Sequence, residues 1–566
     1  SMDKVVEILT SYNTPKKVVV LGNEAIARGA LEAGVNGVFS YPGTPSTEIS
    51  KIFNLVNNFQ NDSSNKDTYS DLVKNKVYFE YSINEKIALE KAIAFSIGGK
   101  SSMCVMKNVG MNVASDALMS ITYQTIVAPV VIIICDDPGC HSSSNEQDSR
   151  HWGTMASVPV FNPATPEDAY NMTKEAFKLS SQLKLPVIVR TTTRVSHSKG
   201  LVYYKNLLVN DSIPSFNRMP EHINIPAKTA AAHKTLLDKL FSEKLDSYFK
   251  TFNKLYFEGN EKELAIISSG VSTSYLIEII KRNDLSEKLD LFDLGLIHPF
   301  PEKGVRDFLS KGFNKVLVVE ELDPIIENAV RTVVQKNKLD CEILGKNFAG
   351  LSPTGEFSLE VIDRVVSEFF EVETIKNQEI NSISDFSEDL PLRPPTLCSG
   401  CPHRATYYAL KLLVPREDQD TVLCGDIGCI GLGALPPLNM IDTINHMGMS
   451  ISMAQGLSEA LKEKEGKVVA MLGDGTFFHS GISSILNAVY TKSDILVIIF
   501  DNRTIGMTGH QDHPGATHLS KYNEIQIEPL LKGMGISHVE TFMPFDIKDT
   551  FQKIEQRLEI KGISVL

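Results

Sequence analysis

The sequence has no apolar run of the roughly 18 residues that a membrane-spanning helix needs, so we predict no membrane segment. Its start, Ser-Met-Asp-Lys, lacks the apolar core of a secretion signal. Eight cysteines in 566 residues are too few for a disulfide-stabilised scaffold. The chain also lacks an excess of basic residues, and a net charge of −13 argues against nucleic-acid binding. We therefore expect a cytoplasmic protein whose thiols are reduced or bound to metal.

The rest of the composition is that of an ordinary globular chain, with 42% hydrophobic and 22% charged residues. Strand-like segments with β-branched cores alternate with segments of helical periodicity. The expected strands are 17–21, 38–41, 77–81, 101–106, 130–135 and 187–190, and the expected helices are 22–34, 84–98, 110–122 and 166–182. This alternation predicts an α/β fold with a parallel, doubly wound sheet.

Two further αβ units follow along the chain. The second has expected strands at 263–270, 289–295 and 315–321. The third has strong apolar strands at 468–473 and 495–500. We interpret the polar segment 57–76 as a surface insertion, 201–262 as a connecting region with long helical stretches, and the acidic, then Pro-rich segment 371–396 as a linker.

The strongest local signal is an apolar strand that ends at Gly473-Asp474-Gly475, with a second apolar strand that ends just before Asn502. A GDG turn by itself also joins strands to helices in proteins that bind no ligand. The Asn at this spacing favours the motif of thiamine diphosphate (ThDP) enzymes. A diphosphate is bound through a divalent cation, and Mg²⁺ prefers oxygen ligands. Resemblance to the motif implies that Asp474, Asn502 and the carbonyl of Thr504 bind Mg²⁺.

Three other features near this motif fit a bound cofactor. Gly473 and Gly475 would let the backbone approach the phosphates, and a helix that we expect to start near His479 would offer N–H groups to the anion. Met447 occupies the position at which the motif places a large apolar residue under the bent cofactor. A core methionine with no such role is the alternative.

ThDP also needs a carboxylate against its aminopyrimidine ring, because protonation of that ring promotes loss of the proton from thiazolium C2. Glu85 opens a helical segment, and the next strand leads into a Gly turn at Gly110, which is the setting in which ThDP enzymes place this glutamate. Glu80, on the preceding strand, is a second candidate. Glu85 also fits a carboxylate that only stabilises a helix N-terminus.

Segments spread from residue 22 to 515 together resemble the large (alpha) subunit of indolepyruvate ferredoxin oxidoreductase. They are GNEAIARGALEAGV, YPGTPSTE, NEKIALE, MKNVGMNVASD, SSSNEQDSR, VRTTTRVSHS, CSGCPHR, GDIGCIGLGALPP and MTGHQDHPG. The resemblance implies three doubly wound αβα units of the ThDP-enzyme type. The implied divisions are a pyrimidine-binding domain (1–200), the connecting region (201–262), a transketolase C-terminal-like domain (263–370), the linker (371–396) and a diphosphate-binding domain (397–566).

The same resemblance points to residues that meet the substrate. The turn YPGTPS is similar to a turn whose Thr reaches the substrate in related oxidoreductases, so Thr44 is a candidate contact. His510 and Gln511 follow the metal loop and are expected to face the same pocket. Arg150 and Arg190 either bind a substrate carboxylate or form structural ion pairs.

Three cysteines, Cys398, Cys401 and Cys429, match cysteines that hold an iron–sulfur cluster near ThDP in related enzymes. A [4Fe–4S] cluster usually needs four thiolates, and the expected fourth would follow the final segment GISVL, with Cys424 as a second possibility. A zinc site and plain thiols are the alternatives. The family's C-terminal ferredoxin-like domain has no counterpart in this sequence, and because an end inside an apolar strand is unusual we expect a longer natural chain.

The function that the resemblance implies is oxidative decarboxylation of an aryl 2-oxo acid such as indolepyruvate, a step of aromatic amino acid catabolism. Coenzyme A takes the acyl group to give an arylacetyl-CoA, CO₂ leaves, and two electrons pass to ferredoxin. The family implies a smaller (beta) subunit and a homodimer or heterotetramer. A non-oxidative ThDP decarboxylase that releases an aldehyde is the first alternative, and a non-catalytic scaffold that keeps ThDP for folding is the second.

Overall fold

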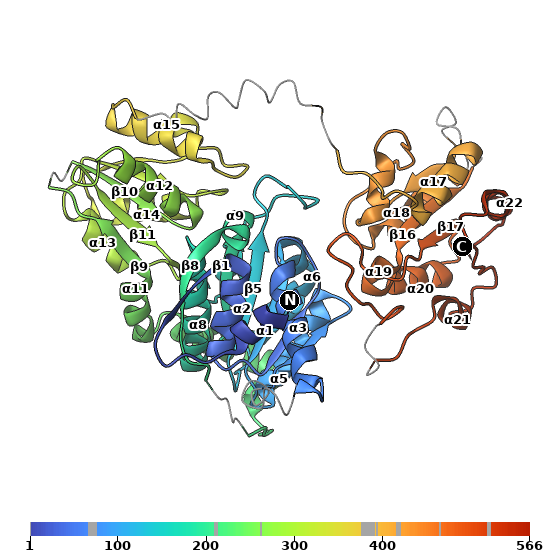
Figure 1. Cartoon of the computed structure of the whole chain (residues 1–566), viewed down its shortest axis with the longest axis horizontal. Coiled ribbons are helices and arrows are strands. Elements are labelled where there is room, and N and C mark those ends of the chain that lie inside the picture. The colour runs from blue at the N-terminus through green and yellow to red at the C-terminus, as the bar shows by residue number, and fades with distance from the viewer. Residues whose placement is uncertain are drawn as a thin grey trace. The chain divides into compact units, whose positions relative to one another are not determined.

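The computed structural model describes residues 2–65, 76–208, 213–260, 263–374, 391, 394–414, 420–462, 466–517 and 522–566. The chain forms two compact units, Ser1–Glu379 and Ile380–Leu566 (Figure 1), and each is described by itself. Within the described ranges, every helix is too short or too polar to cross a lipid bilayer.

The first unit is built around a seven-stranded sheet. Its strands, in spatial order, are β12 (Leu296–His298), β6 (Val160–Phe161), β7 (Val187–Thr192), β5 (Val130–Asp136), β4 (Ser102–Lys107), β2 (Gly37–Ser40) and β3 (Tyr78–Tyr81). All neighbours pair in parallel except β12 with β6. The expected strands from 38 to 190 are therefore confirmed as one doubly wound sheet.

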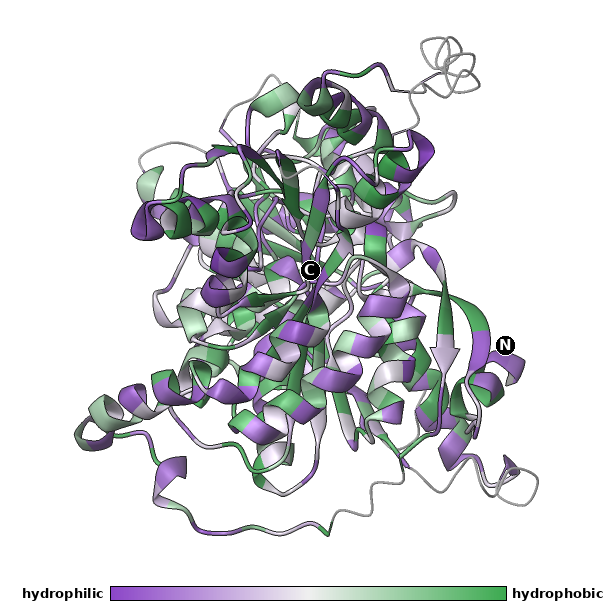
Figure 2. Cartoon of the chain, turned by 90° about the vertical axis from the view of Figure 1, so that its left-hand side faces the viewer, coloured by the Kyte–Doolittle hydropathy of each residue, from purple (hydrophilic) through white to green (hydrophobic). Residues whose placement is uncertain are grey.

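Helices cover both faces of this sheet, and this explains its continuous apolar strands. Every residue of β5 is buried: Val131 and Ile133 point into one apolar cluster, and Ile132 and Ile134 into another. Parallel strands buried on both faces show such runs in place of alternation. One cluster receives α1 (Met2–Leu9), α2 (Gly22–Glu32), α3 (Thr47–Asn61) and α8 (Pro166–Leu183), and the other receives α5 (Glu85–Ile97) and α6 (Asn108–Ile121). In Figure 2 the inner strands are mainly hydrophobic, whereas the outer helices alternate between the two colours.

The segment 17–21 is a strand, but it does not join the parallel sheet. It forms β1 (Lys16–Leu21), which pairs antiparallel with β8 (Lys199–Tyr204) in a separate two-stranded ribbon. One face of the ribbon packs through Val20 and Val202. The outer face leaves Val19 exposed, so the apolar run here reflects a ribbon with one covered face.

A five-stranded sheet forms the rest of the first unit. Its order is β14 (Glu342–Leu344), β13 (Lys315–Val319), β10 (Leu264–Ser268), β11 (Asp290–Leu294) and β9 (Asn253–Phe257), with β9 antiparallel. Strand β9 lies within the expected connecting region 201–262, as do α10 (Pro226–Leu240) and α11 (Asp246–Phe252). The remaining helices of this part are α12 (Val271–Arg282), α13 (Glu302–Leu309), α14 (Ile325–Asn337) and α15 (Leu359–Phe370).

A buried ionic network joins the two sheets of the first unit. Arg150, which begins the short helix α7 (His151–Ala156) as its N-cap, is bound to Asp148 at 2.6 Å and to Glu320 after β13. Its guanidinium also donates to the carbonyls of Glu321 and Asp323 at 2.8 and 2.9 Å. The carboxylates of Asp148 and Glu320 are at most 2% exposed. A buried charge is tolerated only when it is paired in this way.

The second unit has a four-stranded parallel sheet of β15 (Val422–Cys424), β16 (Val468–Gly473), β17 (Ile495–Phe500) and β18 (Ser564–Val565). The bounds of β16 and β17 are those predicted. The helices are α17 (Pro402–Leu413), α18 (Met449–Ala460), α19 (Asp474–Thr476), α20 (Ile482–Tyr490), α21 (Ile527–Gly533) and α22 (Ile547–Leu558). Residues 57–61 of the expected insertion end helix α3, while 66–75 and most of the expected linker lie outside the described residues.

Candidate active site

The carboxyl ends of β16 and β17 place Asp474 and Asn502 at the same edge of the sheet. Asp474 is 2% exposed and begins α19 directly after the N-cap Gly473. The helix therefore starts at Asp474, and the prediction of a start near His479 was wrong, because Phe477–Gly481 is a π-helical turn inside the helical segment. The first N–H groups of the helix lie at the GDG turn.

The three residues predicted to bind Mg²⁺ converge in the structure. One terminal atom of the Asn502 amide lies 3.2 Å from Asp474 Oδ1 and 2.8 Å from the carbonyl oxygen of Thr504. With nitrogen at that position the amide donates to both oxygens. With oxygen there, three oxygens face one another, which is favourable only around a cation. Burial, together with the neighbouring Asp474, raises the pKa of Asp501, so the edge concentrates negative charge that a cation would offset.

Asp426, in the GDIG segment, holds the loop that carries Met447. Its Oδ1 accepts from the N–H of Gly448 at 2.9 Å and its Oδ2 from the N–H of Ser450 at 3.1 Å. These are free N–H groups at the start of α18, so Asp426 acts as a cap from outside the helix. Gly448 has φ +84°, and a Cβ there would lie 2.3 Å from Ser480 Cβ. Met447, half-buried, is thereby fixed beside the π-helical turn.

Cys429 lies near the loop that follows Asn502, but the described residues of this region form no metal site. A Cβ on Gly506 would be 3.6 Å from Cys429 Sγ and 3.3 Å from Asn502 Nδ2. Burial raises the pKa of Cys429, and the nearby thiols of Cys401 and Cys398 raise it further. Across the described ranges, no group of three or more His, Cys, Asp or Glu side chains is arranged to hold a metal ion. The iron–sulfur cluster thus stays a prediction. Cys424 is fully buried on β15.

In the first unit, Glu85 and Gly110 meet at the carboxyl edge of the seven-stranded sheet. Asn84 caps α5 by accepting from the N–H of Ile87 at 3.0 Å, which fixes Glu85 as the first helical residue. Glu85 is 5% exposed, and a Cβ on Gly110 would lie 2.7 Å from its Oε1. Only glycine allows this approach.

Glu80 has a different environment. Its carboxylate accepts from Ser82 at 2.8 Å and is bound by Lys91 and Tyr78. Although burial raises the pKa of Glu80, these three partners hold it below its ordinary value. The group is therefore an ionised member of a structural cluster on β3.

The turn that contains Thr44 follows β2 and is held by its neighbours. Asn23 donates to the carbonyl of Pro45 at 2.7 Å, and Ser142 Oγ donates to the carbonyl of Thr44 at 3.4 Å. Ser142 belongs to the loop after β5, where its N–H donates to Asp137 at 2.8 Å. The loops that follow β2 and β5, the strands on either side of β4, thus meet at Thr44, as ligand-binding loops do at the carboxyl edge of such sheets.

Lys107, the last residue of β4, lies between this turn and Glu85, and sequence reasoning missed it. A Cβ on Gly43 would lie 2.8 Å from Lys107 Cδ, and Nζ donates to the carbonyl of Ser142 at 3.0 Å. No described carboxylate is within ion-pair distance of this ammonium. Burial lowers the pKa of Lys107, while Asp137 and Glu85 act in the opposite direction. The adjacent Asn108 is 1% exposed, and both polar atoms of its amide lack a partner among the described residues.

The two arginines considered for the substrate carboxylate have other partners. Arg150 belongs to the network that joins the sheets, and Arg190 Nε is 2.7 Å from Asp136 Oδ2. Both are buried, so the ion-pair alternative holds and the substrate alternative is dropped. His510 is exposed, with φ +63° and its N–H bonded to the carbonyl of Ile505 at 3.0 Å. Its predicted role stays a prediction.

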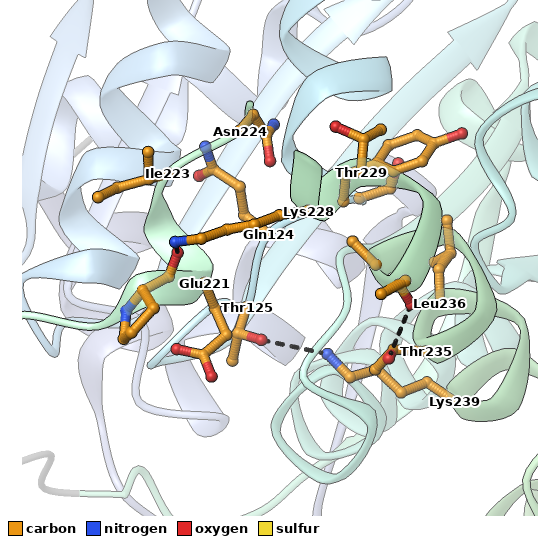
Figure 3. Close-up of a pocket in the computed structure, with 15 residues that line it drawn as sticks. Gln124, Thr125, Glu221, Ile223, Asn224, Lys228, Thr229, Thr235, Leu236 and Lys239 are labelled. Carbon is orange, nitrogen blue, oxygen red and sulfur yellow. Dashed lines mark hydrogen bonds between the residues drawn. The ribbon is translucent and has the colours of Figure 1, made fainter. Parts of the chain in front are cut away.

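A cavity of about 240 Å³ lies elsewhere in the first unit (Figure 3). Its walls are the loop 122–125, residues 220–224 and helix α10, and Lys239 Nζ donates to Thr125 Oγ1 at 3.4 Å. The loop precedes β5, so the cavity is at the amino edge of the sheet. It is therefore separate from the carboxyl-edge residues described above.

Two family models match the chain. "Pyruvate flavodoxin/ferredoxin oxidoreductase, thiamine diP-bdg" matches residues 28–236, and "Thiamine pyrophosphate enzyme, C-terminal TPP binding domain" matches 426–566. The first match includes Thr44 and Glu85, and the second includes Asp474. Both ends of the chain thus carry thiamine-diphosphate-binding modules.

Relatives extend the likeness to nearly the whole chain. Indolepyruvate oxidoreductase subunit IorA of Methanothermobacter thermautotrophicus is 36% identical, over 97% of this chain and 86% of that protein. The subunit of the same name from Pyrococcus horikoshii is 37% identical, over 100% and 87%. The chain belongs to the IorA family. A solved 2-oxoglutarate:ferredoxin oxidoreductase from Magnetococcus marinus has a TM-score of 0.46 and 16% identity, over 62% of this chain and 65% of that one. As an IorA-family member, the chain has the ThDP-enzyme fold and is part of an indolepyruvate ferredoxin oxidoreductase-type enzyme.

Proposed function

We propose that this IorA-family chain binds Mg²⁺ and ThDP and decarboxylates an aryl 2-oxo acid of the indolepyruvate type. The observation that carries the proposal is the meeting of Asp474, Asn502 and the Thr504 carbonyl at one sheet edge. The substrate class comes from the name of the relatives. In this proposal residues 1–200 form the pyrimidine-binding domain, 263–370 the transketolase C-terminal-like domain and 397–566 the diphosphate-binding domain.

The residues at the GDG turn fit a magnesium diphosphate. Asp474 and Asn502 would each supply a side-chain oxygen and Thr504 its carbonyl, all of which are ligands that Mg²⁺ accepts. Gly473 and Gly475 carry no side chain between the turn and a phosphate, and the first N–H groups of α19 favour an anion. Met447, held by the cap at Asp426, would support the cofactor ring.

Glu85 would hold a proton at the aminopyrimidine ring, since it is buried and fitted against Gly110. ThDP, when bound, supplies a carbanion that adds to the 2-oxo carbon and accepts the electron pair left by CO₂. Burial of Glu85 would keep water away from a proton held between its carboxylate and the bound cofactor.

Lys107 would bind the substrate carboxylate, because it is the half-buried ammonium beside the Thr44 turn and no described carboxylate pairs with it. The amide of Asn108, with no partner among the described residues, and the hydroxyl of Thr44 are further polar groups at the same edge. We also assign His510 to the substrate side of the metal loop. A hydrogen bond between the Lys107 ammonium and a substrate carboxylate would contribute roughly 1.5–3 kcal/mol.

The overall reaction balances with coenzyme A and ferredoxin as co-substrates. One 2-oxo acid anion, one CoA thiol and two oxidised ferredoxins give one arylacetyl-CoA, one CO₂, two reduced ferredoxins and one proton. Cys398, Cys401 and Cys429 are proposed ligands of an iron–sulfur cluster. We further propose a smaller subunit as partner, in a homodimer or heterotetramer.

The test is to produce the complete gene product with the neighbouring small subunit and to assay indolepyruvate with CoA and ferredoxin. We expect ferredoxin reduction that needs all three, and an Asp474→Asn variant that no longer binds Mg²⁺ and ThDP. Release of an aldehyde with no ferredoxin reduction would establish the non-oxidative decarboxylase instead. Tight ThDP binding by the Asp474→Asn protein would rule out the metal site.

A further inference from the structure

His513, in the segment HQDHPG, lies against the metal-binding carboxylate. Its Nε2 is 3.0 Å from Asp474 Oδ2, and both side chains are 3% exposed. Its other ring nitrogen, Nδ1, accepts from the backbone N–H of Gly515 at 3.0 Å. A backbone N–H can only donate, so Nδ1 carries no proton. The ring proton is therefore on Nε2, and Nε2–H donates to Asp474.

The imidazole ring is fixed on its other sides as well. It packs on Phe478 with a centroid distance of 5.6 Å and an angle of 34° between the rings. A Cβ on Gly515 would lie 2.7 Å from Phe478 Cε2 and 3.0 Å from His513 Cε1. Glycine is thus needed for the turn to come this close, and the turn is closed by two backbone bonds between His513 and Ala516, at 3.2 and 2.9 Å.

The two oxygens of Asp474 have different surroundings. Oδ2 is taken by His513, whereas Oδ1 accepts from the N–H of Gly475 at 2.8 Å and faces the Asn502 amide at 3.2 Å. A neutral imidazole donor fixes the rotation of the carboxylate without cancelling its negative charge. The carboxylate therefore keeps its negative charge, and Oδ1, on the side that faces Asn502, remains able to bind a cation.

We propose that His513 is a positioning residue that orients Asp474 so that Oδ1 is presented to the cation of the bound diphosphate. The inference rests on the proposed function, because it assumes that Asp474 is a metal ligand. Partners that orient a ligating side chain typically change metal affinity by about 10–100-fold when they are removed.

The experiment measures Mn²⁺ binding by electron paramagnetic resonance in the full chain with its partner subunit, in the presence of ThDP. His513→Phe keeps an aromatic ring on Phe478 but removes the donor, so we expect affinity to fall by about 10–100-fold. His513→Gln places an amide N–H at a similar reach and should retain most of the affinity. His538→Phe, a change at an exposed histidine of the same unit, is the matched control and should have no effect.

A second comparison covers the case in which His513→Phe does not fold. His513→Asn is polar but too short to reach Asp474, so it should bind Mn²⁺ more weakly than His513→Gln. Equal affinities of these two variants, or wild-type affinity in His513→Phe, would overturn the positioning role. If Asp474→Asn also binds Mn²⁺ as well as wild type does, the proposed metal site fails first, and this separates the two claims.

Discussion

Glu85 Oε1 occupies the space that a side chain at Gly110 would need, since a Cβ there would lie 2.7 Å away. Glu85, the first residue of α5, thus packs against Gly110 in the first turn of α6. The contact joins the helices that follow β3 and β4, the strands on either side of β2, and it holds the carboxylate at the edge of the sheet where the Thr44 turn also lies.

Replacing Glu85 by Gln should lower the rate of indolepyruvate-dependent ferredoxin reduction by about 10²–10⁴-fold, the usual contribution of a proton-transferring group. ThDP affinity, measured by calorimetry, should change little, because the amide has the same shape. Glu80→Gln is the control. It should lower the melting temperature through its contacts with Lys91 and Tyr78 and leave turnover per folded protein unchanged. The reverse pattern would make Glu80 the functional carboxylate.

Gly110→Ala should displace Glu85 and reduce turnover by about 10²-fold, because a shift of about 1 Å in a reacting group has an effect of this size. Gly304→Ala in α13 is the matched control, since a Cβ at Gly304 would meet no described atom beyond its own stretch of helix within 4 Å. This change should stabilise the helix by up to about 1 kcal/mol. Full activity in purified Gly110→Ala would show that the close contact has no functional role.

Removing the Lys107 ammonium should raise the KM for indolepyruvate. A loss of about 2 kcal/mol corresponds to about 30-fold, and Lys107→Arg should recover part of it. Lys51→Ala, at an exposed lysine of α3, is the control. Steady-state kinetics decide between the outcomes, and ThDP affinity should be the same in all three variants. An unchanged KM in Lys107→Ala would exclude contact with the carboxylate.

We expect the free energy of unfolding to depend on pH through the buried carboxyl group of Asp293. It is 2% exposed and accepts from Thr273 Oγ1 at 2.6 Å, and burial raises its pKa from 3.8 to about 8. The unfolded chain ionises first, so the contribution of Asp293 to stability is complete below pH 3.8 and is lost as the pH rises to about 8. The loss is at most about 1.4 kcal/mol per pH unit. Asp293→Asn should not lose this contribution, so urea midpoints of variant and wild type should diverge across this window. Parallel midpoints would show that Asp293 is ionised in the folded chain.

The positions of the candidate residues that follow from local sequence were predictable. The GDG turn and Asn502 lie at the ends of two fully apolar strands, and such runs are typical of strands buried inside a parallel sheet. Glu85 is a candidate because it opens a helical segment that is followed by a strand and the Gly turn at Gly110. In both cases the deciding signal lies in the stretch of sequence around the site.

Residues whose role depends on distant partners were not predictable. An apolar run such as 17–21 fits a strand of the central parallel sheet and a strand of a two-stranded ribbon equally well. Only its pairing with β8 shows that it belongs to a ribbon. Arg150 and Arg190 are placed by carboxylates from other segments, so their burial is invisible in the sequence. The motifs around Lys107, Asp426 and His513 stand out in the sequence, but their contacts become visible only in the fold, because each contacts a residue from another loop.

The link between Arg150 and Glu320 also has a consequence for how the chain is divided. The matched family segment ends at residue 236, yet a protein cut there would lose Glu320 and the carbonyl acceptors of Glu321 and Asp323, which leaves the guanidinium with only Asp148. Removing one partner of a buried pair typically costs about 3–5 kcal/mol. We therefore expect the cooperative folding unit to be longer than the matched segment, and a truncation meant to isolate the first sheet should keep the residues through the loop after β13.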